Sequence, residues 1–375
     1  MEARKNNASV DTAIRRNIVV SAVNIRKGGT LTVLRDCLQY LSGRPDLHVT
    51  ALVHSRALCD FPGIDYIELP WSTGSWLKRL KCEYITMFGI SRRLPESDLW
   101  LSLHDTTPRV KAKRQAVYCH TSFPFMKPIL QDLRMDPKIV LFSLFTRYAY
   151  KWNVKRNSHL IVQQDWMRKG LSHMLAFPEG RIIVAPPSFR PLSLESEPAK
   201  MPVFLYVGTP DCHKNFETLF RAAQLLEDKL GKGTFKLIVT VRGDENRYAR
   251  WLHRNWSLSD SIDFRGFLSR EELAKAYGEA SCLVFPSRSE TWGLPISEFL
   301  PSGRPMILAD LPYAHNTASG AASAAFFPVK DAGRLASLMQ EVIKGRLDSF
   351  GPVPSQTIQP PCAAGWDELF SILLK

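Results

Sequence analysis

The sequence predicts an α/β protein built from two doubly wound units, each a parallel sheet with helices on both faces. Short apolar runs alternate with longer amphipathic stretches along most of the chain, a pattern typical of repeated strand–helix–strand units. The alternation stops at a proline-rich segment and then starts again. A length of 375 residues also suits two domains of ordinary size.

The first half contains seven apolar runs that predict strands. The Gly-Gly-Thr turn at 28–30 joins the first strand to a helix ending near residue 41, and Thr30 is expected to cap that helix. Amphipathic stretches at 76–92 and 139–152 predict two more helices. The predicted strands are 17–24, 48–54, 65–69, 99–103, 115–120, 159–164 and 181–185.

Residues 186–202 interrupt this alternation. They include five prolines and show no apolar periodicity, which is typical of an interdomain linker. In the second half, Ser269 and Glu272 predict a capping box, and Asp331 predicts an N-cap. Strands are predicted at 203–208, 236–241, 262–264, 282–285 and 305–309, and helices at 215–230, 269–280, 295–300 and 331–343.

We therefore expect four segments. Residues 1–187 form a first Rossmann-like domain, 188–201 the linker, 202–350 a second domain, and 351–375 a tail whose amphipathic end returns to the first domain. Parallel sheets bind ligands beyond the carboxyl ends of their strands. A ligand site is accordingly expected in a cleft where the two domains face each other.

Composition excludes several classes of protein. Apolar residues make up 45% of the chain and charged residues 23%, which excludes disordered and collagen-like chains. No run reaches the roughly 18 apolar residues of a transmembrane helix, and the N-terminus lacks the apolar core of a signal peptide. Seven scattered cysteines include no Cys-x-x-Cys pair, which argues against a disulfide framework or zinc site and favours the cytoplasm.

The net charge of +13 lies in the first half. Residues 1–200 contain 30 Lys and Arg against 17 Asp and Glu, whereas the rest of the chain contains 19 of each. A basic half suits nucleic acid, an anionic membrane or a phosphorylated substrate, or it serves solubility alone. No nucleic-acid recognition motif accompanies it, so a nucleic-acid-binding protein is a remote alternative.

Several familiar site motifs are absent. No Gly-x-Gly-x-x-Gly follows a strand, and no Walker A loop, His-Glu-x-x-His or Gly-x-Ser-x-Gly occurs. No Asp-x-Asp occurs either, which weakens any mechanism in which a carboxylate-bound metal clamps a nucleotide diphosphate. The sequence therefore predicts no metal and no cofactor.

The most informative segment is 285–303, Phe-Pro-Ser-Arg-Ser-Glu-Thr-Trp-Gly-Leu-Pro-Ile-Ser-Glu-Phe-Leu-Pro-Ser-Gly. Glu290 follows a predicted strand, and Glu298 is expected in the first turn of a helix that Pro295 opens. Gly293 permits close backbone approach, and free N–H groups at the helix start attract anions. Carboxylates accept hydrogen bonds from hydroxyls, so both glutamates could hold a sugar or ribose. Taken singly, each glutamate is also compatible with a simpler role, as a solvent-exposed residue or as a charge that compensates the helix dipole.

This segment resembles the Glu-x7-Glu signature of retaining glycosyltransferases with the GT-B fold. They form the large family 4, glycosyl transferases group 1, whose members make glycolipids, lipopolysaccharides and capsules. Three flanking runs agree in order and spacing: Tyr-Val-Gly-Thr-Pro-Asp-Cys-His-Lys-Asn from residue 206, Phe-Arg-Gly-Phe-Leu-Ser-Arg-Glu-Glu-Leu from residue 264, and the strand with its Pro-Ser turn at 280–287. The resemblance covers residues 203–345 well and the first half loosely.

The resemblance implies roles for individual residues. Glu298 would bind the ribose of a nucleotide sugar, and Glu290 would bind hydroxyls of the transferred sugar. Lys214 would neutralise the departing diphosphate, where fixed positive charge is needed, although a lone lysine is also compatible with a solvated surface. The backbone groups expected to meet the diphosphate and the sugar are those of Gly293, Leu294 and Pro295.

One expected phosphate contact is missing. The family usually has an arginine directly after the glycine of its Val-Gly run, whereas here Gly208 is followed by Thr209. Arg242 and Arg288 are candidates to replace it, and the sequence does not choose between them. The run at 290–293 also departs from the family's Glu-Gly-Phe-Gly but keeps its second glycine.

Acceptor-side candidates lie in the first half. Gly28, Gly29 and Thr30 match the family's glycine-rich acceptor loop, although such a turn is often no more than a turn. His120 resembles the histidine of a His-Thr-Ser turn in some phospholipid mannosyltransferases of the family, where it lies near the reacting sugar. It could donate a hydrogen bond to a hydroxyl or be a packed histidine at a strand end. His104, at another strand end, is the second candidate.

Two stretches, 76–81 and 147–156, combine aromatic with cationic residues. Such stretches suit the headgroup region of an anionic bilayer. An equally good alternative is that the charged side chains form a solvent-exposed helix face and the aromatic side chains pack into the core.

These observations predict a cytoplasmic hexosyltransferase associated peripherally with the inner face of a membrane. It would transfer a hexose, with retention, from a nucleotide sugar to a lipid-linked or polysaccharide acceptor in O-antigen or lipopolysaccharide synthesis. The histidine turn slightly favours GDP-mannose, and UDP-hexoses remain open. A sugar-nucleotide epimerase, an inverting transferase of the same architecture and an inactive scaffolding homologue are the alternatives.

Overall fold

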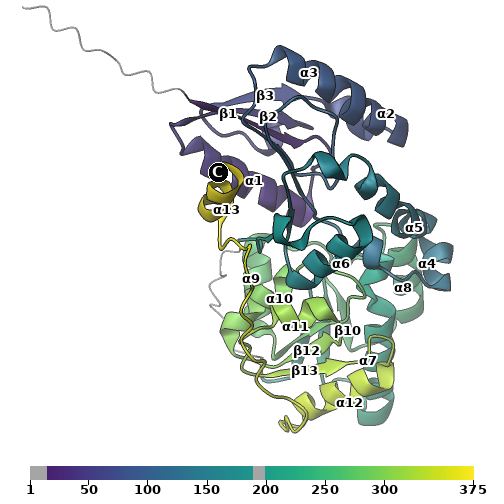
Figure 1. Ribbon diagram of the computed structural model, residues 1–375. Coiled ribbons are helices and arrows are strands. Elements are labelled where there is room, and N and C mark those ends of the chain that lie inside the picture. Colours follow the sequence, from purple (N-terminus) through teal and green to yellow (C-terminus); the bar gives the residue numbers. More distant parts are fainter. Residues whose placement is uncertain (1–14, 189–198) are drawn as a thin grey trace, which may run out of the picture. The chain divides into compact units, whose positions relative to one another are not determined.

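The computed structural model describes residues 15–188 and 199–375 (Figure 1). The described residues form two compact units. Unit 1 comprises the chain up to Cys119 with Trp152–Ile161 and Ala364–Lys375, and unit 2 comprises His120–Lys151 and Val162–Ala363. Most of the expected linker lies outside the described residues.

The first sheet has the strand order β3-β2-β1-β4-β5-β6-β7. The interior strand β1 runs parallel to both neighbours, with Ile18 opposite Val49 of β2 and Leu99 of β4. All seven strands coincide with predicted runs, because an apolar run flanked by turn residues is typical of a fully covered parallel strand. The strands are β1 (Arg16–Ala22), β2 (Leu47–Val53), β3 (Ile64–Glu68), β4 (Leu99–Ser102), β5 (Gln115–Tyr118), β6 (His159–Val162) and β7 (Ile182–Val184).

The helices of unit 1 are α1 (Gly28–Ser42), α2 (Trp76–Lys81), α3 (Met87–Arg93) and α13 (Trp366–Leu373), and a π-helical turn joins α2 to α3. The expectation that Thr30 caps α1 is wrong, because the helix already begins at Gly28 and its N-cap position is Lys27. The α13 helix packs on α1, with the ring of Phe370 stacked on Tyr40 at a centroid distance of 5.5 Å.

The second sheet belongs to unit 2 and has the order β10-β9-β8-β11-β12-β13. Every neighbouring pair in it is parallel. Five of its strands coincide with predicted runs, and β13 was not predicted. The strands are β8 (Val203–Tyr206), β9 (Lys236–Val239), β10 (Ile262–Phe264), β11 (Cys282–Phe285), β12 (Met306–Ala309) and β13 (Ala324–Phe327).

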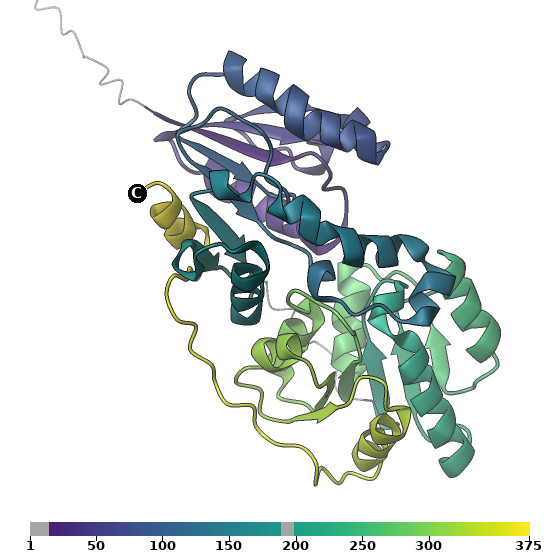
Figure 2. The ribbon, with the colours of Figure 1, turned by 45° about the vertical axis from the view of Figure 1, so that its right-hand side comes forward.

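Figures 1 and 2 show the helices of unit 2, two of which begin at the predicted caps. Ser269 and Glu272 form a capping box, and the side chain of Asp331 accepts from the backbone N–H of Arg334. The helices are α4 (Leu130–Met135), α5 (Pro137–Lys151), α6 (Asp165–Leu175), α7 (Phe216–Leu230), α8 (Arg247–Trp256), α9 (Arg270–Glu279), α10 (Leu294–Phe299), α11 (Pro312–Thr317) and α12 (Ala332–Ile343).

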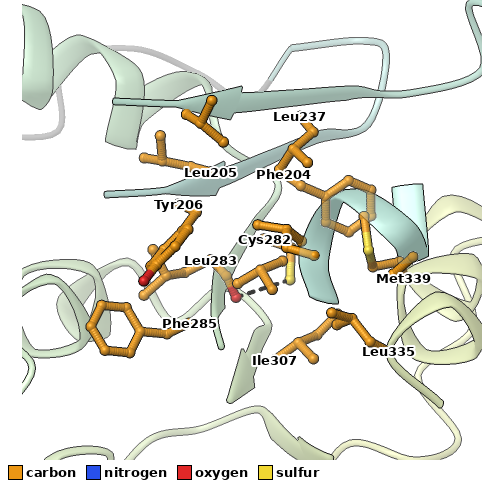
Figure 3. Packing of buried hydrophobic residues seen from close by; sticks show 14 of the residues in the cluster. Phe204, Leu205, Tyr206, Leu237, Cys282, Leu283, Phe285, Ile307, Leu335 and Met339 are labelled. Atoms are coloured by element: carbon orange, nitrogen blue, oxygen red, sulfur yellow. Dashed lines mark hydrogen bonds between the residues drawn. The ribbon is translucent and has the colours of Figure 1, made fainter. Parts of the chain in front are cut away.

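The core of unit 2 lies along β8 and β11, whose side chains are buried on both faces of the sheet. Figure 3 shows Phe204 and Tyr206 of β8, Leu283 of β11 and Met339 of α12 packed within one apolar cluster. Close packing of this kind resists small displacements, so the loops that leave these strands start from fixed positions. All seven cysteines of the sequence are free thiols.

Candidate functional site

The direction of the strand order in unit 2 reverses between β8 and β11. The chain adds β9 and β10 on one side of β8, and β11, β12 and β13 on the other. Doubly wound sheets bind ligands at such a reversal, beyond the carboxyl ends of the strands. Lys214 follows β8 and Glu290 follows β11, so both residues lie in loops at this point.

Lys214 and Glu290 form an ion pair across the reversal. The ammonium Nζ lies 2.6 Å from Oε1 of the carboxylate, and the side chains are 17% and 13% exposed. The backbone of Lys214 is held in turn, because the Oη of Tyr206 donates to its carbonyl at 2.8 Å. A positive and a negative group are therefore fixed side by side at the edge of the sheet.

The two loops are also joined by hydrogen bonds to backbone carbonyls. Asn215 has left-handed backbone geometry, with φ 60°, and its side-chain amide donates to the carbonyls of Pro286 at 3.0 Å and Val329 at 2.8 Å. The N–H of Arg288 donates to the carbonyl of His213 at 2.7 Å. These bonds hold the loop after β11 against the loop after β8 before any ligand is present.

The two arginines expected to replace the missing phosphate contact already have carboxylate partners. The guanidinium of Arg288 binds both carboxylate oxygens of Asp132, a fully buried residue of α4, and it also donates to the carbonyl of Cys212 at 3.0 Å. Arg242 is exposed, and its Nε donates to Asp244 at 2.8 Å. Arg288 thus ties α4 to the loop that contains Glu290.

Glu298 lies on α10 but not in its first turn. The helix begins at Leu294, so Pro295 is its second residue and Glu298 its fifth. The carboxylate accepts a 2.7 Å hydrogen bond at Oε2 from Oη of the buried Tyr277. Burial raises the pKa of Glu298, and the hydrogen bond from Tyr277 partly opposes that rise.

Two glycines of the predicted donor site, Gly293 and Gly208, have roles in the local structure. Gly293 has φ 90°, in the left-handed region, and a Cβ there would lie 3.3 Å from Ile296 and 3.4 Å from Phe285. The N–H of Gly208 donates to Oγ1 of Thr240 at 2.9 Å. Thr209 is exposed beside it, where the family resemblance expects an arginine.

The turn that contains His120 belongs to unit 2 and borders the loop after β11. His120 is buried directly after β5, and Oγ of Ser122 lies 2.7 Å from Oγ of Ser289. The ring of Phe123 meets that of His213 edge-on at 5.5 Å. The structure therefore brings the predicted histidine turn to the loop that contains Glu290.

The acceptor-side candidates of unit 1 lie at the corresponding reversal of the first sheet, after β1 and β4. Gly28 and Gly29 are exposed, and Thr30 is half-buried. His104 is almost fully buried, with Nε2 2.9 Å from Oγ of Ser21. It is one member of a polar network within the unit.

Sequence reasoning missed three residues of the site region: Tyr277, Asp132 and His213. Burial, reinforced by the neighbouring Lys214, lowers the pKa of His213 to about 4, so its ring is neutral at pH 7. No local signal identifies Tyr277 or Asp132, because their partners lie 21 and 156 residues away along the chain.

Neither a metal cluster nor a membrane-spanning helix is found in the described part of the chain. No three or more His, Cys, Asp or Glu side chains within residues 15–188 and 199–375 are grouped so that they could hold a metal ion. No helix in those ranges is both long and apolar enough to cross a bilayer.

Comparison with known families identifies the second half of the chain. Residues 194–351 match the family model described as glycosyl transferases group 1. This part of the chain belongs to that family. The matched range contains both glutamates and Lys214, and the predicted resemblance to this family is confirmed.

Two curated relatives are named O-antigen chain mannosyltransferases. Over 219 residues the chain is 24% identical to the O-antigen chain mannosyltransferase RfbU of Salmonella typhimurium, a match that covers 58% of each protein. Over 164 residues it is 25% identical to the O-antigen chain mannosyltransferase B of Escherichia coli, covering 40% of this chain and 43% of that protein. The chain thus spans about half the length of the curated relatives it matches.

Solved structures match across nearly the whole chain. WaaG, a glycosyltransferase involved in lipopolysaccharide biosynthesis, has a TM-score of 0.64 at 14% identity, covering 87% of this chain and 90% of that chain. Anabaena HepE in complex with UDP-glucose has a TM-score of 0.61 at 13% identity, covering 88% and 90%. At these identities the likeness shows the fold, and the predicted GT-B class, with two Rossmann-like sheets, is confirmed.

Proposed function

We propose that this protein is a retaining hexosyltransferase that uses a nucleotide sugar as donor and a lipid-linked or polysaccharide glycan as acceptor. The Lys214–Glu290 ion pair carries the proposal. It lies at the strand-order reversal of a group 1 glycosyltransferase domain, at the sheet edge where doubly wound folds bind nucleotides.

Each polar group at this edge has a chemical task in the proposal. Lys214 neutralises the negative charge that grows on the departing diphosphate, and fixed charge in a water-poor site stabilises such a transition state strongly. Glu290 accepts hydrogen bonds from hydroxyls of the transferred hexose, and Glu298 accepts from the ribose. Because the loops are already joined, little reorganisation is needed when the donor binds.

The preferred donor is GDP-mannose. Two curated relatives with matching segments are named mannosyltransferases, which supports a mannosyl donor. The likeness in fold to HepE, solved with UDP-glucose, keeps UDP-hexoses as the second candidate. Both donors present a diphosphate to Lys214 and a ribose to Glu298. Only contacts with the nucleobase and the transferred hexose can therefore distinguish GDP-mannose from a UDP-hexose.

The names of the same relatives support a growing O-antigen glycan as acceptor. If that glycan is attached to a lipid, the protein works at the cytoplasmic face of a membrane. His120 is the proposed acceptor-side contact, since its turn borders the Glu290 loop.

A panel of nucleotide sugars tests the proposal. A true donor binds the folded state and raises its melting temperature, more strongly as its concentration exceeds Kd. We expect GDP-mannose to stabilise the wild type, and Lys214→Ala and Glu298→Ala to lose most of that shift. Lys330→Ala, at an exposed residue of unit 2, is the matched control.

Product analysis separates the remaining alternatives. NMR of the new glycosidic bond gives the α-anomer from an α-linked donor if the enzyme retains configuration. A β-product would indicate an inverting transferase. A changed nucleotide sugar, with no transfer, would indicate an epimerase.

A further inference from the structure

Two consecutive buried glutamines, Gln163 and Gln164, follow β6 in unit 2, with exposed fractions of 5% and 2%. Both ends of the Gln164 carboxamide are engaged: Nε2 donates to Oγ1 of Thr317 at 2.8 Å, and Oε1 accepts from the indole N–H of Trp166 at 2.5 Å. Oε1 of Gln163 is also buried, yet it has no hydrogen-bond partner among the residues that the structure describes. A buried polar atom without a partner is costly, so its presence calls for a reason.

His213 presents a second atom of this kind. Its Nδ1 is buried and lacks a hydrogen-bond partner within the described ranges. The ring is held by a different contact, because it meets the ring of Phe123 edge-on at 5.5 Å. Burial and the neighbouring Lys214 lower the pKa of His213 to about 4, so the ring is neutral at pH 7. His213 therefore offers an uncharged nitrogen in the loop that follows β8.

Both atoms belong to segments that are tied to the loop after β11, which contains the proposed sugar-binding carboxylate. Thr317, the partner of Gln164, donates in turn to the carbonyl of Trp292. The carbonyl of His213 accepts from the N–H of Arg288 at 2.7 Å. These hydrogen bonds lie inside unit 2, so they hold the two segments next to the proposed donor site.

The register of the strands places Gln163 level with His120. β5 and β6 are parallel, with Tyr118 opposite Ile161, and His120 and Gln163 each follow their paired residue by two positions. The turn that contains His120 borders the loop after β11. Gln163 thus lies beyond the carboxyl end of its strand, where parallel sheets bind ligands.

The chemistry of Gln163 and His213 selects an uncharged ligand. A carboxamide and a neutral imidazole each donate and accept hydrogen bonds, and neither carries a charge. Hydroxyls have the same dual character. A phosphate would instead meet an acceptor oxygen at Gln163 and gain no counter-charge there. Of the parts of a nucleotide sugar, the hexose has the densest set of hydroxyls.

We propose that Gln163 and His213 bind hydroxyls of the transferred hexose and thereby help to select the sugar. Oε1 of Gln163 accepts from one hydroxyl, and Nδ1 of His213 pairs with another. This inference rests on the proposed function, because it requires a nucleotide sugar at the Lys214–Glu290 pair. It adds two uncharged side chains to the carboxylate of Glu290 as groups that recognise the sugar.

Titration calorimetry with nucleotide sugars and with their nucleoside diphosphates tests the proposal. GDP-mannose is compared with GDP, and UDP-glucose with UDP. Gln163→Leu and His213→Phe roughly keep the size of each side chain and remove its polar atoms. Each variant is expected to bind the nucleotide sugar about three- to tenfold more weakly, the effect of one lost hydrogen bond. Each should bind the nucleoside diphosphate like the wild type.

Melting curves without ligand separate sugar binding from a purely structural role. Gln163→Leu removes a buried oxygen that has no partner in the described part of the chain. The variant should therefore melt at or above the wild-type temperature. A residue retained for structure alone would give the opposite pattern, a lower melting temperature with unchanged sugar binding, and that pattern would overturn the proposal.

Matched controls make comparable changes elsewhere in unit 2. Gln340→Leu is the same substitution on α12, where Nε2 of Gln340 is also buried without a hydrogen-bond partner among the described residues. Ser261→Ala removes another such atom, Oγ of a fully buried serine that precedes β10. Both controls should bind nucleotide sugar and nucleoside diphosphate like the wild type.

The outcomes separate this inference from the proposed function. If Gln163→Leu and His213→Phe kept wild-type affinity for a nucleotide sugar that the wild type binds, the inference would be wrong and the proposed function would stand. Equal weakening for nucleotide sugar and nucleoside diphosphate would also overturn the inference, since the lost contact would then not be with the sugar. A wild type that binds no nucleotide sugar would overturn both.

Discussion

The phenolic oxygen of Tyr277 donates a 2.7 Å hydrogen bond to Oε2 of Glu298. Tyr277 is fully buried on α9, so its hydroxyl cannot follow a moving carboxylate. The bond orients one oxygen of Glu298, and Oε1 is the atom that we expect to accept from a ribose hydroxyl. Tyr277 is therefore a positioning residue for the proposed donor site.

Tyr277→Phe should move the pH dependence of donor binding upward. Glu298 accepts from a hydroxyl best when ionised, so donor affinity should fall as the pH drops through the pKa of Glu298. Burial raises that pKa and the hydrogen bond from Tyr277 lowers it, so loss of the hydroxyl raises it further. Calorimetric titration of donor across a pH series measures the shift.

Tyr66→Phe is the control for this shift. The Oη of Tyr66 donates to the carbonyl of Cys59 at 2.6 Å in unit 1, so this variant also loses a tyrosine hydrogen bond. Its pH profile should match that of the wild type. If the pH profile of Tyr277→Phe also matched that of the wild type, the positioning role of Tyr277 would be wrong.

Lys214→Ala should weaken donor binding about 10- to 100-fold, the effect of losing a hydrogen bond to a charged group. It should also slow transfer, because the departing diphosphate then loses the fixed positive charge of the ammonium group. Glu290→Gln keeps the shape of its side chain and should lower kcat more than it raises KM. A Lys214→Ala enzyme with unchanged kcat/KM would contradict the assignment.

Asp132→Ala should destabilise the protein by about 3–5 kcal/mol, because it leaves the buried guanidinium of Arg288 without its carboxylate. The double variant Asp132→Leu/Arg288→Met should be less destabilised, since it removes both charges. Urea unfolding gives the free energies. Asp244→Ala breaks an exposed pair with Arg242 and should lower the free energy of unfolding far less. Equal losses for the two single variants would mean that the Arg288 pair is not effectively buried.

His213 should make stability depend on pH below neutrality. Its pKa is about 4 in the fold against 6.5 ordinarily, because burial and Lys214 disfavour the charged ring. As the pH falls from 6.5 towards 4, the unfolded chain takes up a proton that the folded chain does not. The free energy of unfolding then falls across this window. His213→Gln should flatten that slope, and His173→Gln, at an exposed position, should not.

The sequence predicted most strands because their cause is local. An apolar run between turn residues, such as 203–208 or 282–285, needs little knowledge of its surroundings to be recognised. The strand β13 was not predicted, because Ala324–Phe327 follows an alanine-rich stretch and contains no β-branched residue. The α8 helix was also missed, although Tyr248, Ala249, Leu252 and Trp256 form one buried face, because the cations between them make the segment polar on average.

The site was predictable only where residues lie close together in sequence. Glu290 and Glu298 share one segment, and Lys214 follows a recognisable strand. The contacts of Arg288 with Asp132 and of Glu298 with Tyr277 depend on the tertiary fold, which a single sequence does not reveal. For the same reason, the sequence proposes Arg288 as a phosphate contact without revealing its buried partner Asp132, whereas the partner of Arg242, Asp244, lies only two residues away.

Calorimetric titration of GDP-mannose and UDP-hexoses into the wild type and into Glu298→Ala tests the central claim most directly. The account predicts that at least one of these nucleotide sugars binds the wild type at a single site, and that the variant binds it roughly tenfold more weakly or worse, as expected when a hydrogen bond to a charged group is lost. Equal affinity of the two proteins for that donor, or no binding of any nucleotide sugar to the folded wild type, would contradict it.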